Sequence, residues 1–345
     1  MKITVLNKAC LKLYFLGSGS IGIPSLNALI GTPDIELVGI GTQPDRPAGR
    51  HKTLTPTDVG RWASEQNLKV DKPPSVNSET FLEYLGNLKP DILLVISFGQ
   101  ILKEKLLELP SVSCVNAHAS LLPFYRGASP IAAALLNGDS KTGVSFMKME
   151  RGLDTGPVYC SYEYHIKENE RASELEDALA SLAGKHAPDV LLKIASGALS
   201  PIKQDDGKAS YAGKISRKDA CFTWSEKAVE INSRSRAFYP WPGAVFPAVL
   251  KHGLETEIKI SRARVCKEME SRPGEILKAD KHGWIVACGE DALELLSVIP
   301  KGKKEMSGAE FIRGAHFTTG DILPSGKVNT EINNLKTNKH IGIYR

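Results

Sequence analysis

The amino-acid sequence predicts an α/β protein, with a three-layer domain built on a mostly parallel sheet and a smaller β domain after it. Up to about residue 200, short apolar runs alternate with segments of helical spacing, as successive βαβ units do. One run, between Asp91 and Phe98, is almost continuously apolar, as expected of a parallel strand covered on both faces. After residue 214, helical spacing gives way to short strand-like runs separated by Gly, Pro and charged residues.

The first strand is expected at Lys12–Leu16, and a glycine-rich turn follows it. Gly17–Gly22 reads G-x-G-x-x-G, a spacing that favours dinucleotide binding between a strand and a helix of a Rossmann-like domain. An acidic residue should then end the second strand, but the strand that ends near Gln43 carries none. We therefore interpret the glycines as a tight turn of a Rossmann-like fold without a dinucleotide.

The remaining elements of the first domain continue the alternation. From Ser173 to Ile194, apolar residues recur at spacings of three and four in spite of Pro188, which predicts a helix. Strands are expected at 113–119 and 143–149, and a helix at 128–136. The active crevice of such a sheet lies at the carboxyl ends of its strands, so the end of 113–119 is of particular interest.

The second part of the chain is expected to be a small, OB-like β-barrel. Its strand-like runs are 244–251, 257–264, 284–287 and 292–299. The polar, irregular segment Ser200–Lys214 is interpreted as a linker. The predicted boundaries are 12–199 for the catalytic domain, 200–214 for the linker, 215–323 for the barrel and 324–345 for a loosely ordered tail.

Charge is unevenly distributed between the two parts. Residues 1–207 hold 21 Lys and Arg against 23 Asp and Glu, a net charge of −2, whereas residues 208–345 hold 23 against 16, a net charge of +7. A basic barrel beside a nearly neutral domain is typical of an RNA-binding accessory. The alternative is a solvated basic surface, and composition alone does not separate the two.

Composition and cysteine usage exclude several classes of protein. The 345 residues are 42% hydrophobic and 24% charged, as in ordinary globular proteins, and no apolar run is long enough to span a bilayer. The six cysteines are scattered without a C-x-x-C pair, which argues against a disulfide framework or zinc site and indicates a reducing compartment. We expect a bacterial cytoplasmic protein rather than one of an organellar matrix, with residues 1–11 as an extension before the first strand.

The dense set of chemically active side chains lies between Cys114 and Val158. Asn116 and His118 are two residues apart in an apolar run, so in a strand their side chains share a face. Asp154 lies in the sequence GLDTG, whose two glycines favour a tight turn that could aim its carboxylate at the end of that strand. Each residue alone also has an ordinary interpretation, as a buried core histidine or as an acid in a turn or helix cap.

The full order of motifs is more specific than any single one. NAHASLLP at 116–123 is followed by YRGASP at 125–130, GD at 138–139, TGV at 142–144 and GLDTG at 152–156. This order closely resembles that of the 10-formyltetrahydrofolate-dependent formyltransferases. The resemblance implies that the catalytic residues are Asn116, His118 and Asp154. It implies 10-formyltetrahydrofolate as co-substrate and a folate-bordering segment made of Ser120, Leu121, Leu122 and Pro123. No metal is expected, because the eight histidines form no ligand cluster in the sequence.

Further motifs resemble the branch of that family that acts on methionyl-tRNA. The loop Thr42–Leu54 contains QPDRPAGR, and the second domain contains YAGKIS, RAFYPWP, PGEI and PKGKKEM. The resemblance implies formylation of the α-amino group of initiator methionyl-tRNA. We expect no membrane association and no obligate protein partner. The residues expected at the tRNA are Arg46, Arg50, Lys52, Lys301, Lys303 and Lys304. Because it holds two prolines and Gly49, the loop is expected to be mobile and to form no regular ladder.

The predicted chemistry is direct formyl transfer, without a nucleophilic Ser or Cys. Asn116 and His118 would donate to the formyl oxygen as it gains negative charge, and Asp154 would orient the imidazole. Three alternatives remain: a relative with a small acceptor such as a sugar nucleotide or glycinamide ribotide, an RNA-binding protein with a decayed enzyme domain, and a nicotinamide-dependent dehydrogenase. The basic second domain and the cationic loop argue against a small acceptor. The intact catalytic set argues against a decayed enzyme domain. The dehydrogenase alternative is supported only by the glycine turn.

Overall fold

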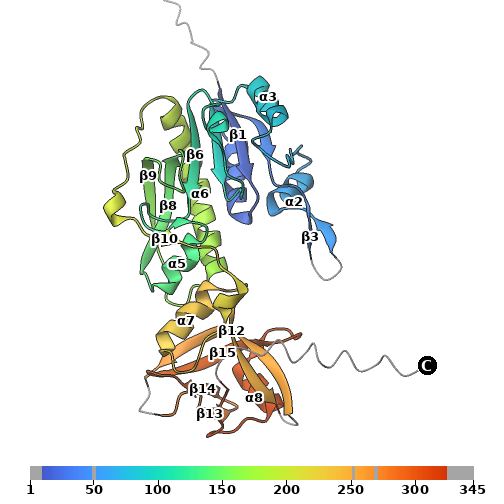
Figure 1. Cartoon of the computed structure of the whole chain (residues 1–345), viewed down its shortest axis with the longest axis vertical. Helices are drawn as coiled ribbons and strands as arrows, with labels where there is room; N and C mark the ends of the chain where they lie inside the picture. Colours follow the sequence, from blue (N-terminus) through green and yellow to red (C-terminus); the bar gives the residue numbers. More distant parts are fainter. Residues whose placement is uncertain (1–9, 49–51, 251–252, 268–270, 325–345) are drawn as a thin grey trace, which may run out of the picture. The chain divides into compact units, whose positions relative to one another are not determined.

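A computed structural model describes residues 10–48, 52–250, 253–267 and 271–324 of the chain (Figure 1). The chain divides into two compact units, each with its own large sheet. The first unit holds most of the chain up to Lys214, and the second holds residues from Ile215 onward together with segments 135–138 and 169–173. The predictions for residues 1–9 and for the tail after Pro324 lie outside the described residues.

The first unit is built on a six-stranded, mostly parallel sheet, which confirms the predicted α/β class (Figure 1). The strand order is β2-β1-β5-β6-β8-β9; the first four strands are parallel, whereas β8 and β9 are antiparallel to their neighbours. All five residues of β5, ILLVI, are buried, as its apolar sequence predicts. The strands are β1 (Leu11–Gly17), β2 (Ile35–Gly41), β5 (Ile92–Ile96), β6 (Ser113–His118), β8 (Lys141–Lys148) and β9 (Val158–His165).

Helices cover both faces of this sheet. Side chains alternate across β1, so Leu16 belongs to a core cluster with Phe81 of α3, whereas Phe15 approaches Gly22 near the start of α1. The predicted helix at 173–194 is present as α6, and its Gly184 lies against the first turn of α1. The helices are α1 (Ile23–Ile30), α2 (Asp58–Glu65), α3 (Glu79–Leu88), α4 (Glu104–Leu107), α5 (Pro130–Leu136) and α6 (Ala172–Ala195).

The loop Thr42–Leu54 contains a short antiparallel ladder between β3 (Arg46–Ala48) and β4 (Thr53–Thr55). The prediction that this loop forms no regular ladder is therefore wrong. A two-stranded hairpin has a free outer edge on each strand, and a proline is tolerated where its nitrogen faces that edge. Pro47 thus marks an edge strand rather than the absence of a strand.

The segment Ser200–Lys214, interpreted from its polarity as a linker, is attached to the first unit at three places. Ile202 bridges Val158, and Gln204 is buried. β10 (Tyr211–Ala212) forms a parallel ladder with β7 (Arg126–Gly127). Residues far apart in the chain are therefore joined close to the end of β6.

The second unit is an antiparallel half-barrel, the form taken by the predicted small β domain. Its strand order is β11-β12-β15-β14-β13, with β16 paired to β15. Its core holds a chain of aromatic side chains in which Trp224 contacts Phe246, Phe246 contacts Trp284, and Trp284 stacks on Phe311. The elements are α7 (Ala228–Ala237), β11 (Ala244–Leu250), β12 (Leu254–Cys266), β13 (Ile276–Asp280), β14 (Gly283–Ala287), β15 (Ala292–Pro300), β16 (Met306–Ser307) and α8 (Gly308–Ala315).

Candidate active site

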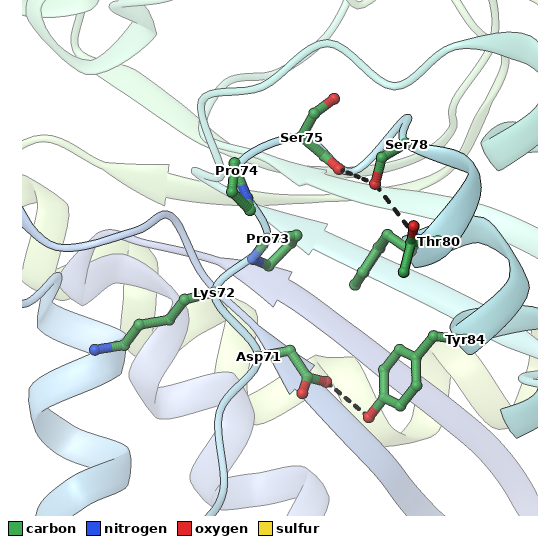
Figure 2. A pocket seen from close by; sticks show the side chains of 9 residues that line it. Asp71, Lys72, Pro73, Pro74, Ser75, Ser78, Thr80 and Tyr84 are labelled. Carbon is green, nitrogen blue, oxygen red and sulfur yellow. Dashed lines mark hydrogen bonds between the residues drawn. The ribbon is translucent and has the colours of Figure 1, made fainter.

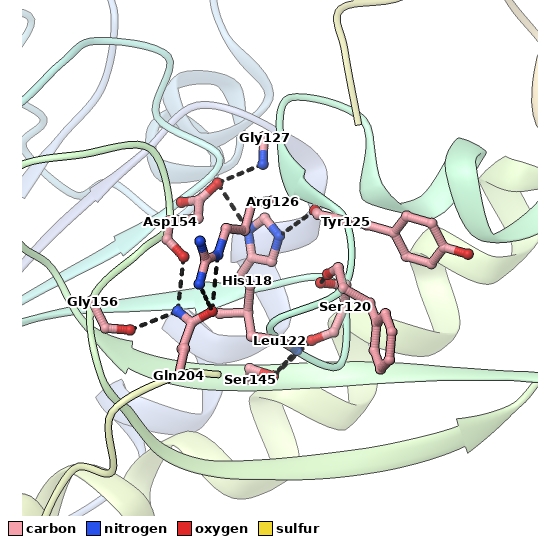
Figure 3. Close-up of polar contacts among 11 residues, drawn as sticks. His118, Ser120, Leu122, Tyr125, Arg126, Gly127, Ser145, Asp154, Gly156 and Gln204 are labelled. Carbon is pink, nitrogen blue, oxygen red and sulfur yellow. Dashed lines mark hydrogen bonds and ion pairs between the residues drawn. The ribbon is translucent and has the colours of Figure 1, made fainter. Parts of the chain in front are cut away.

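His118 is the last residue of β6 and lies at the carboxyl end of the sheet, where it is 6% exposed. Its Nε2 lies 3.0 Å from the carbonyl oxygen of Tyr125 (Figure 3). A carbonyl oxygen only accepts, so Nε2 carries the proton and donates. Nδ1 is then the nitrogen that faces Asp154, at 3.7 Å from Oδ2.

Asp154 is held in a turn that needs its two flanking glycines. Its own φ is +54°, in the left-handed region that Asp tolerates better than most residues. Gly152 has a φ of +119°, and a Cβ on Gly156 would lie 1.9 Å from the carbonyl oxygen of Lys148. The backbone N–H of Gly127 donates to Oδ2 of Asp154 at 2.8 Å (Figure 3). The turn therefore aims the carboxylate at the end of β6, as the sequence predicts.

His118 and Asp154 face each other across a short gap. Nδ1 of the ring lies 3.7 Å from Oδ2 of the carboxylate, which is longer than a hydrogen bond but close enough for a charge interaction when the ring is protonated. The side chains are only 7% and 15% exposed, so little solvent screens this interaction.

Asn116 lies two residues before His118 on the same strand, so the two side chains point to the same face of the sheet. Within the described residues its side chain makes no hydrogen bond to another part of the protein, and it is only partly buried. Its amide is therefore free to donate to a ligand. By contrast, both ring nitrogens of His118 already face protein groups.

The four residues predicted to border the folate form a turn fixed to β8. Ser120 is buried, and its hydroxyl donates to the carbonyl oxygen of Phe124 at 2.6 Å. Ser145 of β8 donates to the carbonyl oxygen of Ser120 at 2.7 Å and accepts from the backbone N–H of Leu122 at 3.0 Å. Leu121, Leu122 and Pro123 are half-buried and leave apolar surface beside the candidate site.

Two buried polar residues that sequence reasoning missed lie in the same cluster. Arg126 is 2% exposed and donates to Gln204 (Figure 3). It also donates to Asp206. Gln204 in turn donates to the backbone of the Asp154 turn. Arg126 lies within the motif YRGASP, which is the only signal that points to it, whereas Gln204 lies in a polar stretch without periodicity.

The glycine-rich turn after β1 is not a phosphate cradle. The backbone N–H groups of Ser18 and Gly19 both donate to the carbonyl oxygen of Ser97. Dinucleotide-binding turns instead direct such groups at a pyrophosphate. This observation argues further against the dehydrogenase alternative.

The predicted tRNA loop is anchored at its start. Gln43 donates to the carbonyl oxygen of Phe98, just after β5, and accepts from Nη2 of Arg46 at 2.5 Å. Asp45 pairs with Lys72 at 2.6 Å, so it does not neutralise Arg46. Lys52 is exposed, and the prediction for Arg50 lies outside the described residues.

The three lysines predicted at the tRNA in the second unit are not equivalent. Lys301 forms an ion pair with Glu257 at 3.0 Å. Lys303 and Lys304 are exposed and have no ion pair within the described part of the chain. Two of the three positive charges are therefore left for an external anion.

A separate hollow lies beside α3 and contains none of the predicted site residues (Figure 2). Oδ2 of Asp71 accepts from the hydroxyls of Tyr14 and Tyr84 at 2.8 and 3.0 Å. Burial, and next the hydrogen bond to Asp71, raises the pKa of both tyrosines, so each remains a donor. These contacts tie α3 to β1.

The described residues contain no group of three or more His, Cys, Asp or Glu side chains that could hold a metal ion. Among the helices that the structure describes, none is long and apolar enough to cross a membrane.

Comparison with known families gives two matches along the chain. Residues 12–191 match the family described as formyl transferase, and residues 214–316 match the formyl transferase C-terminal domain. Among curated proteins, the methionyl-tRNA formyltransferase of Clostridium novyi (strain NT) is 39% identical over 91% of this chain and 100% of its own length. That of Bacillus subtilis (strain 168) is 38% identical over 93% of this chain and 99% of its own length.

Solved structures share the fold. HypX from Aquifex aeolicus, in complex with tetrahydrofolic acid, aligns over 92% of this chain and 50% of its own with a TM-score of 0.60 and 14% identity. An N-formyltransferase from Helicobacter canadensis, in complex with folinic acid and dTDP-3-aminofucose, aligns over 83% of this chain and 99% of its own with a TM-score of 0.60 and 20% identity. At these identities the likeness concerns the fold alone.

Proposed function

The chain belongs to the methionyl-tRNA formyltransferase family, and from that premise we propose how Asn116, His118 and Asp154 carry out its reaction. Its function is that of a methionyl-tRNA formyltransferase, which adds a formyl group to the amino group of the methionine on tRNA. The observation that carries this assignment is the 36–39% identity to curated enzymes of that name over 88–93% of the chain.

The proposed formyl donor is 10-formyltetrahydrofolate, and the proposed acceptor is initiator methionyl-tRNA in the bacterial cytoplasm. The donor is supported by the shared fold with proteins that were crystallised with tetrahydrofolic acid and folinic acid. The half-buried apolar surface of Leu121, Leu122 and Pro123 suits a flat folate ring. The acceptor is supported by the names of curated relatives, such as the methionyl-tRNA formyltransferases of the bacteria Clostridium novyi and Bacillus subtilis.

The attack step needs a hydrogen-bond donor for the formyl oxygen. The amine attacks the formyl carbon, the carbonyl oxygen gains negative charge, and the bond from that carbon to the folate nitrogen then breaks. Asn116 supplies the donor because its amide is not used within the described protein. One pre-aimed donor of this kind is worth about 3 kcal/mol of transition-state stabilisation.

One proton must move from the attacking amine to the departing folate nitrogen. Asp154 is proposed to take it through Oδ1, since Oδ2 already accepts from Gly127 and faces His118. When its ring is protonated, His118 stabilises the negative charge that develops beside it. It reaches the formyl oxygen directly only if Nε2 leaves the carbonyl of Tyr125.

The test of this function is a formyl-transfer assay with matched acceptors. Purified protein and 10-formyltetrahydrofolate are offered charged initiator tRNA, charged elongator methionyl-tRNA, free methionine and dTDP-amino sugars in parallel. We expect transfer to initiator methionyl-tRNA at a kcat/KM at least 100-fold above that for the other acceptors. Preferred transfer to an amino sugar would refute the assignment in favour of a small-acceptor enzyme.

A further inference from the structure

We infer that Arg126 and Gln204 are positioning residues, which together form a buried clamp that holds His118 and Asp154 at their working separation. The inference rests on the proposed catalytic roles of those two residues. It concerns side chains that contribute through the backbone they support.

The first half of the clamp is the segment 125–127, which supports both catalytic side chains. The carbonyl oxygen of Tyr125 accepts from Nε2 of His118 at 3.0 Å. The backbone N–H of Gly127 donates to Asp154 at 2.8 Å. Arg126 lies between these two backbone groups, so its position sets where the imidazole and the carboxylate meet.

The Arg126 side chain is fixed by Gln204 (Figure 3). Its Nε and Nη2 both donate to Oε1 of Gln204, at 3.0 and 2.9 Å, in the fork geometry of a guanidinium. Nη2 also donates to Asp206 at 2.8 Å. Burial would lower the pKa of Arg126, but hydrogen bonding and charge interaction with Asp206 outweigh it and raise the pKa, so the donors are retained.

Gln204 completes the clamp on the other side. Its Nε2 donates to the carbonyl oxygens of Asp154 and Gly156, at 2.8 and 2.6 Å. All four hydrogen-bonding positions of the amide are therefore used, two toward Arg126 and two toward the Asp154 turn. A flipped amide would place its NH₂ against the guanidinium, so only one orientation satisfies both sides.

This arrangement makes one buried glutamine the link between the two halves of the site. A buried network whose members are all satisfied is rigid, and loss of one member leaves the others unpaired. If the Asp154 turn moves away from segment 125–127, the carboxylate and imidazole lose their alignment. Displacement by about 1 Å costs on the order of 100-fold in rate.

The sharpest variant is Gln204→Glu in the full-length protein. A carboxylate keeps the acceptors for Arg126 but presents oxygen atoms, not N–H groups, to the carbonyls of Asp154 and Gly156. Gln204→Leu, which adds no charge, is the second variant. In both we expect kcat to fall about 10- to 100-fold, with KM for folate and tRNA changed less than about 3-fold.

Coupling to Asp154 separates positioning from general loss of stability. In an Asp154→Asn background the carboxylate no longer has to be aligned. Either Gln204 change should then lower kcat by less than a further factor of about 3. Ser113→Ala is the matched control, because it removes a buried hydrogen bond to Tyr159 at the opposite end of β6. It should leave kcat within about 2-fold. Equal losses from the Gln204 changes in both backgrounds would overturn the inference.

An NMR measurement on His118 needs no acceptor substrate, so it tests this inference independently of the proposed function. The imidazole ¹⁵N and Nε2–H signals of His118 are assigned by their loss in His118→Asn. Both Gln204 variants should shift or broaden these signals, whereas Ser113→Ala should not. Unchanged His118 signals, or global unfolding of both Gln204 variants, would refute the clamp. Failure of the parent to use methionyl-tRNA would refute only the proposed function.

Discussion

The candidate catalytic cluster and the predicted tRNA-binding surfaces are built in opposite ways. In the cluster, the side chains of His118 and Asp154 are at most 15% exposed and are held by several protein groups. Arg46, Lys303 and Lys304 are exposed and have at most one polar partner within the described residues. The first region fixes a geometry, whereas the second offers charge.

The physical consequence is a difference in how much each side chain can matter. A buried hydrogen bond or charge interaction is weakly screened, so its loss is expensive and local. An exposed cation contributes a small, salt-dependent amount, and several such cations add up. Changes in the cluster should therefore act on kcat, and changes on the basic surfaces should act on binding and its salt dependence.

The largest effect is expected for Asp154→Asn. The substitution keeps the shape and the contact with Gly127 but removes the charge that faces His118 and the proposed proton acceptor. We expect kcat for formyl transfer to fall about 1000-fold, within the range of lost acid–base catalysis, while folate affinity and thermal stability change little. Near-normal turnover would remove Asp154 from the mechanism and weaken the contrast between the two regions.

Asn116→Ala tests the proposed donor to the formyl oxygen. Because the amide has no other partner in the described part of the protein, its removal should cost little stability and about 100-fold in kcat. Steady-state kinetics with saturating folate measures this effect. A rise in KM alone, with kcat preserved, would show instead that Asn116 only binds substrate.

Arg46→Ala tests the anchored cation of the β3–β4 hairpin. Gln43 already orders this guanidinium, so contact with an acceptor-stem base would be worth about 1–3 kcal/mol and would affect discrimination between tRNAs. We expect kcat/KM for initiator tRNA to fall more than for elongator tRNA, and more than in Lys52→Ala. If both variants have the kcat/KM of the parent protein for both tRNAs at two salt concentrations, the hairpin is only a solvated surface and does not contact tRNA.

The lysines of the second unit offer an internal comparison. Lys303→Ala and Lys304→Ala should each lower the slope of log affinity against log salt by about one unit if each contacts a phosphate. Lys301→Ala should have a smaller effect, since Lys301 is paired with Glu257. Filter-binding titrations at several salt concentrations measure the slopes. Equal slopes for all three variants and the parent would show that the tRNA phosphates contact none of these lysines.

The smallest effect concerns Glu305, next to these lysines. Hydrogen bonds from Ser261 and then Ser297 lower its pKa below the ordinary value of 4.5. A lowered pKa contributes stability above pH 4.5 that is lost as pH falls through the folded-state pKa. Glu305→Gln should therefore slightly lower the melting temperature at pH 7 and flatten its decline in acid. An unchanged acid profile would contradict this role.

The sequence by itself determined the fold class and the catalytic candidates. The continuous burial of β5 and the helical spacing of α6 can be predicted from the local pattern of apolar residues, because each element repeats its own pattern of exposure. The tight turn at Asp154 is likewise local, since its flanking glycines are required by backbone geometry. Such features depend on residues a few positions apart.

Only the tertiary structure decided which groups meet. Gln204 contacts Arg126 across 78 residues and Asp154 across 50, and no periodicity marks it in the polar segment where it lies. The carbonyl of Tyr125 holds Nε2 of His118, and Glu257 pairs with Lys301. The pairing of β3 with β4 arises because a free hairpin edge tolerates Pro47. Which distant polar groups contact each other depends on how the chain folds back on itself. Composition and residue spacing do not reveal this path.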